Sequence, residues 1–342
     1  MDRILEIGGF AAGFCGRLFA QNGHEVLRVE TASRPAWVSQ ESTDLFLHAG
    51  KQRITGVSTK LLSELAAQAD IVVLEAECAD EIDTYGFDSW DTPVKIAITP
   101  FGRTGPKKNW RATSNVLLAM GGYTNLMGDP GRAPLTLPGH YVEFQAGQFG
   151  YVAANACRIG GEPNVADIGM FECLMALSQF TTVQWHCSNR IRSRHGSDFW
   201  WVVPTNLFRC KDGWCYLNIV PTFWDAMTTF LDRPELVIDP RFESNDTRMD
   251  HRDELHAIIE AVLSDLSKER IRQRATESRI PLGVVQTFDE VLSDEHLAAR
   301  AFWQTVQGEG DPVLSPSLAF RFDEEPRVSL ALEEPQAGRV HD

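Results

Sequence analysis

Glu172 is the residue whose place in the sequence most directly suggests chemistry. It follows a short apolar run from Val165 to Phe171 and precedes a helical stretch from Cys173 to Phe180. A carboxylate at the end of a buried strand is costly unless it is hydrogen-bonded, paired or used in a reaction. One reaction that uses such a group is acyl transfer through a covalent anhydride. The alternative is a structural acid or a charge at a helix N-terminus, and the local pattern alone favours that alternative.

Two clusters of basic residues could bind an anionic cofactor. The net charge of −15 argues against a nucleic-acid surface, which would need a basic face, but a local cluster can still bind phosphate. The alternative for each cluster is a solvated loop or helix face. The clusters are Arg103, Lys107, Lys108 and Arg111, and further along Arg190, Arg192 and Arg194.

Composition limits the class of protein. With 342 residues, 43% hydrophobic and 23% charged, the chain is typical of a soluble globular protein of one large or two ordinary domains. No apolar run approaches the roughly 20 residues of a membrane helix, and the N-terminus lacks the pattern of a secretory signal. The seven cysteines show no metal-ligand spacing and indicate reduced thiols. We therefore predict a cytoplasmic protein without a bound metal or membrane association.

Strand and helix patterns alternate over the first hundred residues. Apolar strands are expected at 4–7, 25–30, 71–74 and 94–99, with helices at 11–21 and 59–69 between them. Such alternation predicts an α/β fold with a parallel, Rossmann-like sheet. The glycines from Gly8 to Gly13 do not form a dinucleotide fingerprint, because Phe10 stands where the second glycine is needed. Glu30 at the end of the second strand resembles a ribose-binding acid, but without that loop we do not expect NAD binding.

The second half of the chain changes character after residue 199. Residues 200–203 and 213–220 flank a hairpin-turn signal at Lys211 to Gly213, and helical patterns follow at 223–231 and 253–278. Short strands and loops are expected after Asp311. The aromatic stretch from Phe199 to Trp201 suggests a bulky apolar acyl group, although these side chains could equally belong to the core. A second, smaller domain is the simplest partition.

Several separated segments resemble the family III CoA-transferases, which include formyl-CoA, carnitine-CoA and bile-acid-CoA transferases and the related α-methylacyl-CoA racemases. The resemblance covers about nine-tenths of the chain. It implies a Rossmann-like large domain at 1–195, a smaller α+β domain at 196–305 and a return to the large domain at 306–342, in two interlocked chains. The segments that carry it are Ala11–Glu30, Gly50–Arg53, Ile98–Pro106, Ala119–Gly122, Leu231–Leu255 and Ile280–Trp303.

The same resemblance implies the catalytic residue. The family's catalytic aspartate ends a segment of the form Val-Asp-Val-Ser-Leu-Leu-Asp, and Glu172 stands at that position. Its longer side chain would displace the attacking oxygen by more than an ångström, and misplacement on that scale can cost about a hundredfold in rate. Glu143 likewise stands where the family has aspartate and is a possible supporting residue, as is His140. Both could equally be structural.

The resemblance preserves the CoA site only in part. Residues 74–79 replace the family's Glu-Asn-Phe-Arg-Pro-Gly segment, so that Glu75 and Glu77 stand where polar contacts to CoA are expected. Thr31 replaces a phosphate-binding arginine, although Arg34 could reach the same place. A planar guanidinium suits phosphate oxygens through paired hydrogen bonds. The candidate CoA-binding residues are Lys51, Arg53, Arg103, Arg111 and Arg34.

These residues predict an enzyme that moves CoA from an acyl-CoA to a free carboxylic acid through a glutamyl anhydride and a glutamyl-CoA thioester. CoA is then a substrate, and no permanently bound cofactor is expected. Thr113 and Ser114 replace the histidine and aspartate of the racemases, which argues against racemisation. Two alternatives stay open: a non-catalytic subunit that partners an active paralogue, or another acyl-CoA enzyme such as a lyase, hydratase or isomerase. The expected assembly is a homodimer or a heteromer with a paralogous subunit.

Overall fold

A computed structural model describes residues 1–31, 41–161, 163–199, 201–308, 310–321 and 330–338. The chain divides into two compact units. The first contains Met1–Thr124, Thr136–Arg192 and Glu295–Asp342, and the second contains Asn125–Leu135 and Ser193–Asp294. Among the described residues, none of the helices combines the length and hydropathy needed to cross a bilayer.

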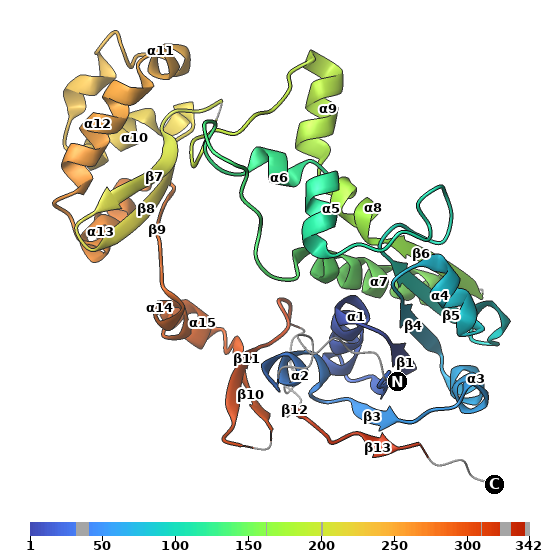
Figure 1. The fold of residues 1–342 in the computed structure, drawn as a ribbon. Helices are drawn as coiled ribbons and strands as arrows, with labels where there is room; N and C mark the ends of the chain where they lie inside the picture. The colour runs from blue at the N-terminus through green and yellow to red at the C-terminus, as the bar shows by residue number, and fades with distance from the viewer. Residues whose placement is uncertain (32–40, 162, 200, 309, 322–329, 339–342) are drawn as a thin grey trace. The chain divides into compact units, whose positions relative to one another are not determined.

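A seven-stranded parallel sheet forms the centre of the first unit, in the order β13-β3-β2-β1-β4-β5-β6 (Figure 1). Without β13 this is the strand order of a Rossmann fold, so the predicted α/β class and parallel sheet are confirmed. The strands are β1 Arg3–Ile7, β2 Glu25–Val29, β3 Gln52–Thr55, β4 Ile71–Glu75, β5 Val94–Thr99, β6 Asn164–Gly169 and β13 Gln336–Ala337.

Two hydrophobic layers cover the two faces of this sheet. Successive strand residues point to opposite faces, so Ile4 joins one layer and Leu5 the other. Helices α1 (Phe10–Gln21), α5 (Ser114–Met120), α7 (Tyr141–Gly160) and α8 (Met170–Ala176) contribute to the layer of Ile4. Helices α3 (Thr59–Gln68), α4 (Ala79–Thr84) and η1 (Phe87–Ser89) contribute to the other.

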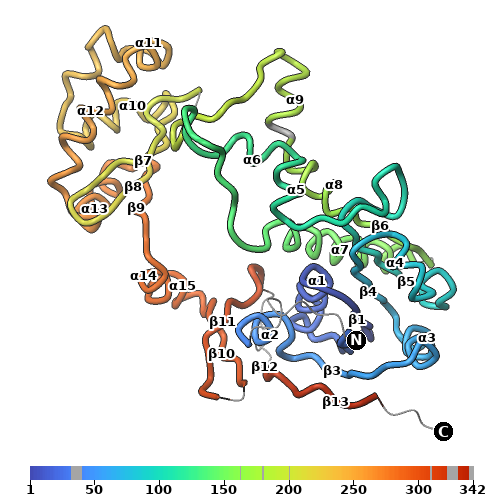
Figure 2. Tube along the Cα trace, in the orientation of Figure 1, coloured from blue at the N-terminus to red at the C-terminus, as the bar shows by residue number. Residues whose placement is uncertain are grey.

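The end of the chain returns to the beginning of the sheet. In Figure 2 the red C-terminal trace runs beside the blue trace of β3, and the residue pairing shows β13 parallel to β3. Before it, β10 (Trp303–Gln307) pairs with β11 (Val313–Pro316) and β12 (Leu330–Ala331). Val306 and Leu330 pack on Leu45 of α2 (Glu41–His48). The remaining helices of this unit are α9 (Gln179–Ser188) and α15 (Glu295–Ala299), while α6 (Tyr123–Leu126) spans the boundary between the units.

The second unit is a small antiparallel sheet with helices. Strand β7 (Thr205–Cys210) pairs with β8 (Gly213–Asn218), and β8 pairs with β9 (Leu282–Val284). The predicted hairpin is present, but its first strand begins at Thr205 and does not include the described residues 201–203 that were expected to flank the turn. The predicted long helix at 253–278 is two helices, because Ser267 caps the second one through the Arg270 N–H. The helical elements are η2 Pro221–Phe223, α10 Trp224–Leu231, η3 Pro234–Val237, α11 Asn245–Asp250, α12 Arg252–Leu263, α13 Lys268–Ser278 and α14 Phe288–Leu292.

Candidate active site

Glu172 lies in the first turn of α8, directly after β6, and is exposed. The sequence predicts a buried strand before Glu172. This prediction is wrong, because most residues of β6 are exposed or half-buried in the single chain. Strand β6 is the outer strand of the sheet with β5 as its neighbour, and Val165 is 43% exposed. The carboxylate therefore does not bear the cost of a buried charge, and it is accessible to a reacting partner.

The loop after β5 lies against the start of α8. The Phe171 N–H donates to the Pro100 carbonyl at 3.0 Å, and the Arg103 N–H donates to Asp167 Oδ2 at 2.8 Å. Between these two bonds, Gly102 has a φ of +77°, a conformation that favours glycine. The loop of the Ile98–Pro106 segment is thus tied to β6 and α8 beside Glu172.

Glu143 and His140 lie together at the start of α7. The Ser114 hydroxyl donates a hydrogen bond to Glu143 Oε2, and His140 Nδ1 lies 3.8 Å from Glu143 Oε1. Burial acts to raise the pKa of Glu143, but its hydrogen bonds with His140 and Ser114 outweigh burial, and the pKa lies below its ordinary value. The ring of His140 stacks on Phe10 at 4.1 Å, which joins this pair to the first residue of α1.

Among the acids of this region, Glu75 has the most strongly shifted pKa. It ends β4, where the strand order switches between β1 and β4, and its Oε2 accepts the Ala12 N–H in the first turn of α1 at 2.8 Å. Burial raises the pKa of Glu75 to about 7, although the backbone N–H groups of Ala12 and Ala11 oppose the shift. A Cβ on Gly9 would lie 2.7 Å from Glu75 Oε1. The glycine is therefore required by the close approach of this carboxylate.

Sequence reasoning marked Glu75 only as a misfit in a CoA-binding segment. The start of α1 gives a sequence signal for the role of Glu75. Helix α1 begins after Gly9, which offers no capping side chain, and has no acidic residue in its first turn. Its N–H groups therefore need an acceptor from elsewhere in the chain.

Two of the basic residues predicted to bind CoA are engaged inside the protein. The buried Lys51 ammonium donates to Glu6 Oε2 at 2.5 Å and to the Gly13 carbonyl at 2.7 Å. Burial lowers the pKa of Lys51 to about 8. Arg53 is 7% exposed and lies between Glu30 and Asp44, at 2.7 and 3.1 Å. A phosphate could reach either cation only by displacing these carboxylates.

The other two lie nearer the surface, in the loop after β5. Arg103 pairs with Asp88 at 2.7 Å, and its guanidinium lies over the ring of Phe87. Arg111 pairs with Glu77 at 2.7 Å, and both side chains are more than half exposed. Exposed pairs of this kind are weak, so Arg111 is available to an anionic ligand. Arg34 lies outside the described residues.

The structure thus brings several of the predicted residues to one edge of the sheet. Glu75, Arg103 and Glu172 follow the carboxyl ends of the adjacent strands β4, β5 and β6, where ligands bind in open α/β sheets. His140 and Glu143 join them through α1 and α7. Lys51 and Arg53 instead belong to the buried ion pairs of β1 to β3. Among the described residues, no group of three or more His, Cys, Asp or Glu side chains could hold a metal ion.

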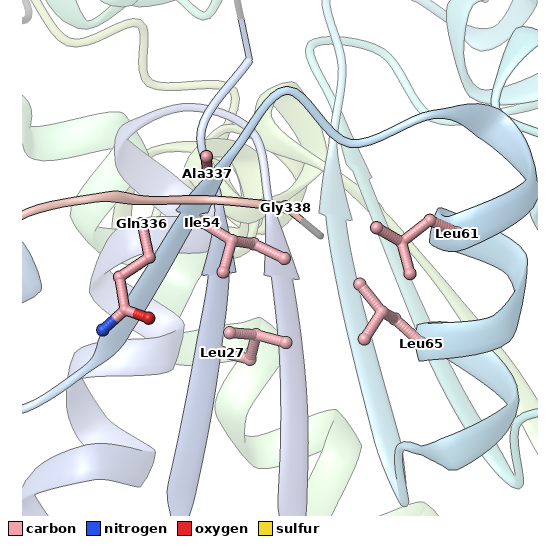
Figure 3. A pocket seen from close by; sticks show the side chains of 7 residues that line it. All are labelled: Leu27, Ile54, Leu61, Leu65, Gln336, Ala337 and Gly338. Carbon is pink, nitrogen blue, oxygen red and sulfur yellow. The ribbon is translucent and has the colours of Figure 1, made fainter. Parts of the chain in front are cut away.

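A separate cavity of about 600 Å³ lies on the face of the sheet that α3 covers (Figure 3). Leu27 and Ile54 form its floor on β2 and β3, and Leu61 and Leu65 face it from α3. The chain segment 336–338 passes over it. None of the predicted site residues lines this cavity.

Comparison with known proteins decides the family. Residues 2–341 match the sequence model of CoA-transferase family III. The chain belongs to CoA-transferase family III. This family III enzyme is 28% identical over 340 residues to the succinyl-CoA–D-citramalate CoA-transferase of Chloroflexus aurantiacus, across 91% of this chain and 83% of that protein.

Two further comparisons extend this assignment. The family III enzyme is 25% identical over 359 residues to the alpha subunit of the succinyl-CoA–L-malate CoA-transferase of Chloroflexus aurantiacus, across 95% of this chain and 82% of the subunit. Its fold matches the crystal structure of Rv3272 from Mycobacterium tuberculosis with a TM-score of 0.83 and 22% identity, across 98% and 96% of the two chains. The predicted family and the predicted class of enzyme are confirmed.

Proposed function

We propose that this enzyme transfers CoA from an acyl-CoA to a carboxylic acid through covalent intermediates on Glu172. The observation that supports the proposal is the position of Glu172: an exposed carboxylate after β6, at the carboxyl edge of the sheet, where the family has its catalytic aspartate. The names of its relatives suggest a dicarboxylic donor such as succinyl-CoA, which we therefore place first among the donors to be tested.

The proposed reaction has two symmetrical halves. A Glu172 oxygen attacks the thioester carbon of the donor, and CoA leaves as the thiolate to give a mixed anhydride. The thiolate attacks the glutamyl carbon, releases the donor's carboxylate and forms a glutamyl-CoA thioester. The carboxylate of the acceptor attacks this thioester, and the thiolate leaves. The thiolate then attacks the acceptor's carbonyl carbon, which yields the new acyl-CoA and frees Glu172. No net proton transfer is needed.

We further propose that Arg103 and Arg111 contact the phosphates of CoA, and that Glu143 supports the site through its hydrogen bond from Ser114. Both arginines lie in the loop after β5, and the backbone N–H of Arg103 ties that loop to Asp167 of β6. Each is held by carboxylates that are themselves more than half exposed, so exchange for a phosphate is not opposed by burial. The contributions of Lys51, Arg53 and Arg34 stay predictions.

Trapping of the covalent intermediate tests the proposal. The purified protein is incubated with succinyl-CoA or another acyl-CoA, then with hydroxylamine, and its peptides are examined by mass spectrometry. We expect a hydroxamate at Glu172 that is absent in Glu172→Gln. Glu75→Gln is the matched control, since it alters the other carboxylate at a strand end and should leave the label at Glu172. An unlabelled Glu172 across a broad panel of acyl-CoA donors would contradict the proposal.

A second candidate function is that of a partner subunit, and the apolar surface of α7 supports an assembly of some kind. Phe149, Val152 and Ile159 lie on one face of this helix and are 38, 62 and 84% exposed. A contiguous apolar face of this sort marks an interaction site. We propose a second copy of the chain, interlocked as in the family, or a paralogue, as the name of the alpha-subunit relative suggests.

Light scattering combined with a transferase assay separates these assemblies. An active homodimer of the purified chain supports the first. An inactive chain that co-purifies from its host with an aspartate-bearing paralogue, and gains activity with it, supports the second.

A further inference from the structure

The Glu172 carboxylate lies beside Gly169, the last residue of β6, in space that a side chain at position 169 would fill. A Cβ placed on Gly169 would lie 3.0 Å from Glu172 Oε2 and 3.4 Å from its carboxyl carbon. The carboxylate therefore folds back over the strand end. Backbone strain does not explain this glycine, because its φ of −83° and ψ of 119° are open to any residue.

The backbone nitrogen of Gly102 borders the same space. It lies 3.2 Å from the Cβ position on Gly169. Gly102 is buried, and within the described part of the chain its N–H donates no hydrogen bond. Buried backbone N–H groups are nearly always paired, so an unpaired one whose nitrogen borders the space beside Glu172 is a candidate donor to a bound ligand. The loop holds it there through the Arg103–Asp167 and Phe171–Pro100 bonds.

We propose that Gly169 is a positioning residue for Glu172, and that the Gly102 N–H is a hydrogen-bond donor to the acyl oxygens formed on that carboxylate. This inference rests on the proposed function. Glutamate is longer than aspartate by one methylene, and the space left by Gly169 lets the longer side chain fold back. Its carboxylate is thereby kept beside the strand end and the donor. Preorganised N–H donors of this kind stabilise the negative oxygen of a tetrahedral acyl intermediate.

The family segment that residues 166–172 resemble, Val-Asp-Val-Ser-Leu-Leu-Asp, has serine at the position of Gly169 and aspartate at the position of Glu172. The two differences are physically coupled. The side chain at position 169 would occupy the volume into which Glu172 folds, whereas an aspartate does not extend into that volume. The two substitutions should therefore compensate for each other.

A double-mutant cycle tests this coupling. In Gly169→Ser, or in the smaller Gly169→Ala, we expect kcat to fall about ten- to a hundredfold, as for an ångström-scale misplacement, with the KM for acyl-CoA changed less than about twofold. Glu172→Asp alone should also lose activity. The double variant Gly169→Ser with Glu172→Asp should recover at least about tenfold over the less active single variant, which a merely structural role of Gly169 would not produce.

Gly160→Ala is the control for a glycine replacement, since a Cβ at Gly160 would meet nothing within 4 Å. Its kcat should equal that of the parent enzyme. Unchanged kcat in Gly169→Ala, or a double variant whose loss equals the product of the single losses, overturns the inference even if Glu172 is labelled by acyl-CoA. If the parent enzyme is active but unlabelled at Glu172, and Glu172→Gln keeps full activity, the proposed function fails and this inference fails with it.

Discussion

Two carboxylates at the carboxyl edge of the same parallel sheet have opposite surroundings. Glu75 ends the interior strand β4, accepts the N–H of Ala12 and has its pKa raised to about 7 by burial. Glu172 follows the outer strand β6 and is exposed. The difference comes from position in the sheet, because a central strand is covered by helices on both faces while an outer strand lacks one neighbour.

This difference separates two uses of the same chemical group. A carboxylate held by a helix N-terminus is committed to the fold, and its charge is costly because it is desolvated. An accessible carboxylate can be reached by an acyl carbon and can attack it. The comparison predicts that replacing each acid has a different kind of consequence.

The largest expected effect is on catalysis at Glu172. Glu172→Gln removes the nucleophile but keeps the shape of the side chain, so kcat should fall by about a thousandfold or more, as for loss of a covalent nucleophile. Because the residue is exposed, the unfolding temperature should hardly change. Steady-state kinetics and calorimetry measure the two quantities. Full activity in Glu172→Gln would show that Glu172 is not the nucleophile.

The next effect concerns the packing that holds α1 in place for Glu75. A Cβ on Gly147 of α7 would lie 2.6 Å from the Ala11 carbonyl oxygen and 3.2 Å from the Cys15 nitrogen. Gly147→Ala should lower the free energy of unfolding by about 1–3 kcal/mol, the usual cost of overpacking. On the same helix, Gly160→Ala should be neutral or stabilising by up to about 1 kcal/mol. Equal effects in denaturant unfolding would contradict the close α1–α7 contact.

The pH dependence of stability is the third way to separate the two acids. The pKa of Glu75 rises on folding, so the folded state holds more protons, and stability falls as the pH rises from about 4.5 through about 7. Glu75→Gln should remove this loss and raise the free energy of unfolding at pH 8 by roughly 3 kcal/mol, with little change at pH 4. Unfolding at several pH values tests this sign. A parallel shift at all pH values would show that ionisation of Glu75 is not involved.

The smallest effect is expected at the exposed pair of Glu77 and Arg111. Glu77→Gln leaves Arg111 without a competing carboxylate, so the affinity for CoA should rise about two- to threefold at low salt and lose this gain in high salt. Calorimetric titration with CoA measures the change. Glu64→Gln, which alters another exposed pair with Lys60, is the control. If Glu77→Gln weakens CoA binding, the arginine is not a phosphate ligand.

The sequence was sufficient for the family and for part of the local structure, but α2, β3 and α4 were not predicted. Strand and helix patterns up to residue 99 correspond to β1, α1, β2, α3, β4 and β5, because period and caps are local properties. The exposure of β6 could not be read in this way, since an apolar run does not say whether a strand has one neighbour or two. The break at Ser267 was missed because the helical patterns on its two sides join smoothly.

Site residues were harder to predict because their roles depend on partners far away in the sequence. The sequence predicts that Lys51 binds a phosphate of CoA, but Glu6, 45 positions earlier, accepts a hydrogen bond from its ammonium inside the protein. Glu75 was noticed only by type, since its contact with Ala12 requires the pairing of β1 and β4. Pattern and resemblance identify which residues matter; the sheet order determines which of them meet.

The return of the chain to β3 has a consequence for biosynthesis. The unit that contains Glu172 needs both the first and the last stretches of the polypeptide, whereas residues 193–294 of the second unit are continuous. During translation the smaller unit can mature while the larger one waits for its closing strand to leave the ribosome. Premature termination shortly before Gln336 would therefore release a chain whose main sheet lacks β13.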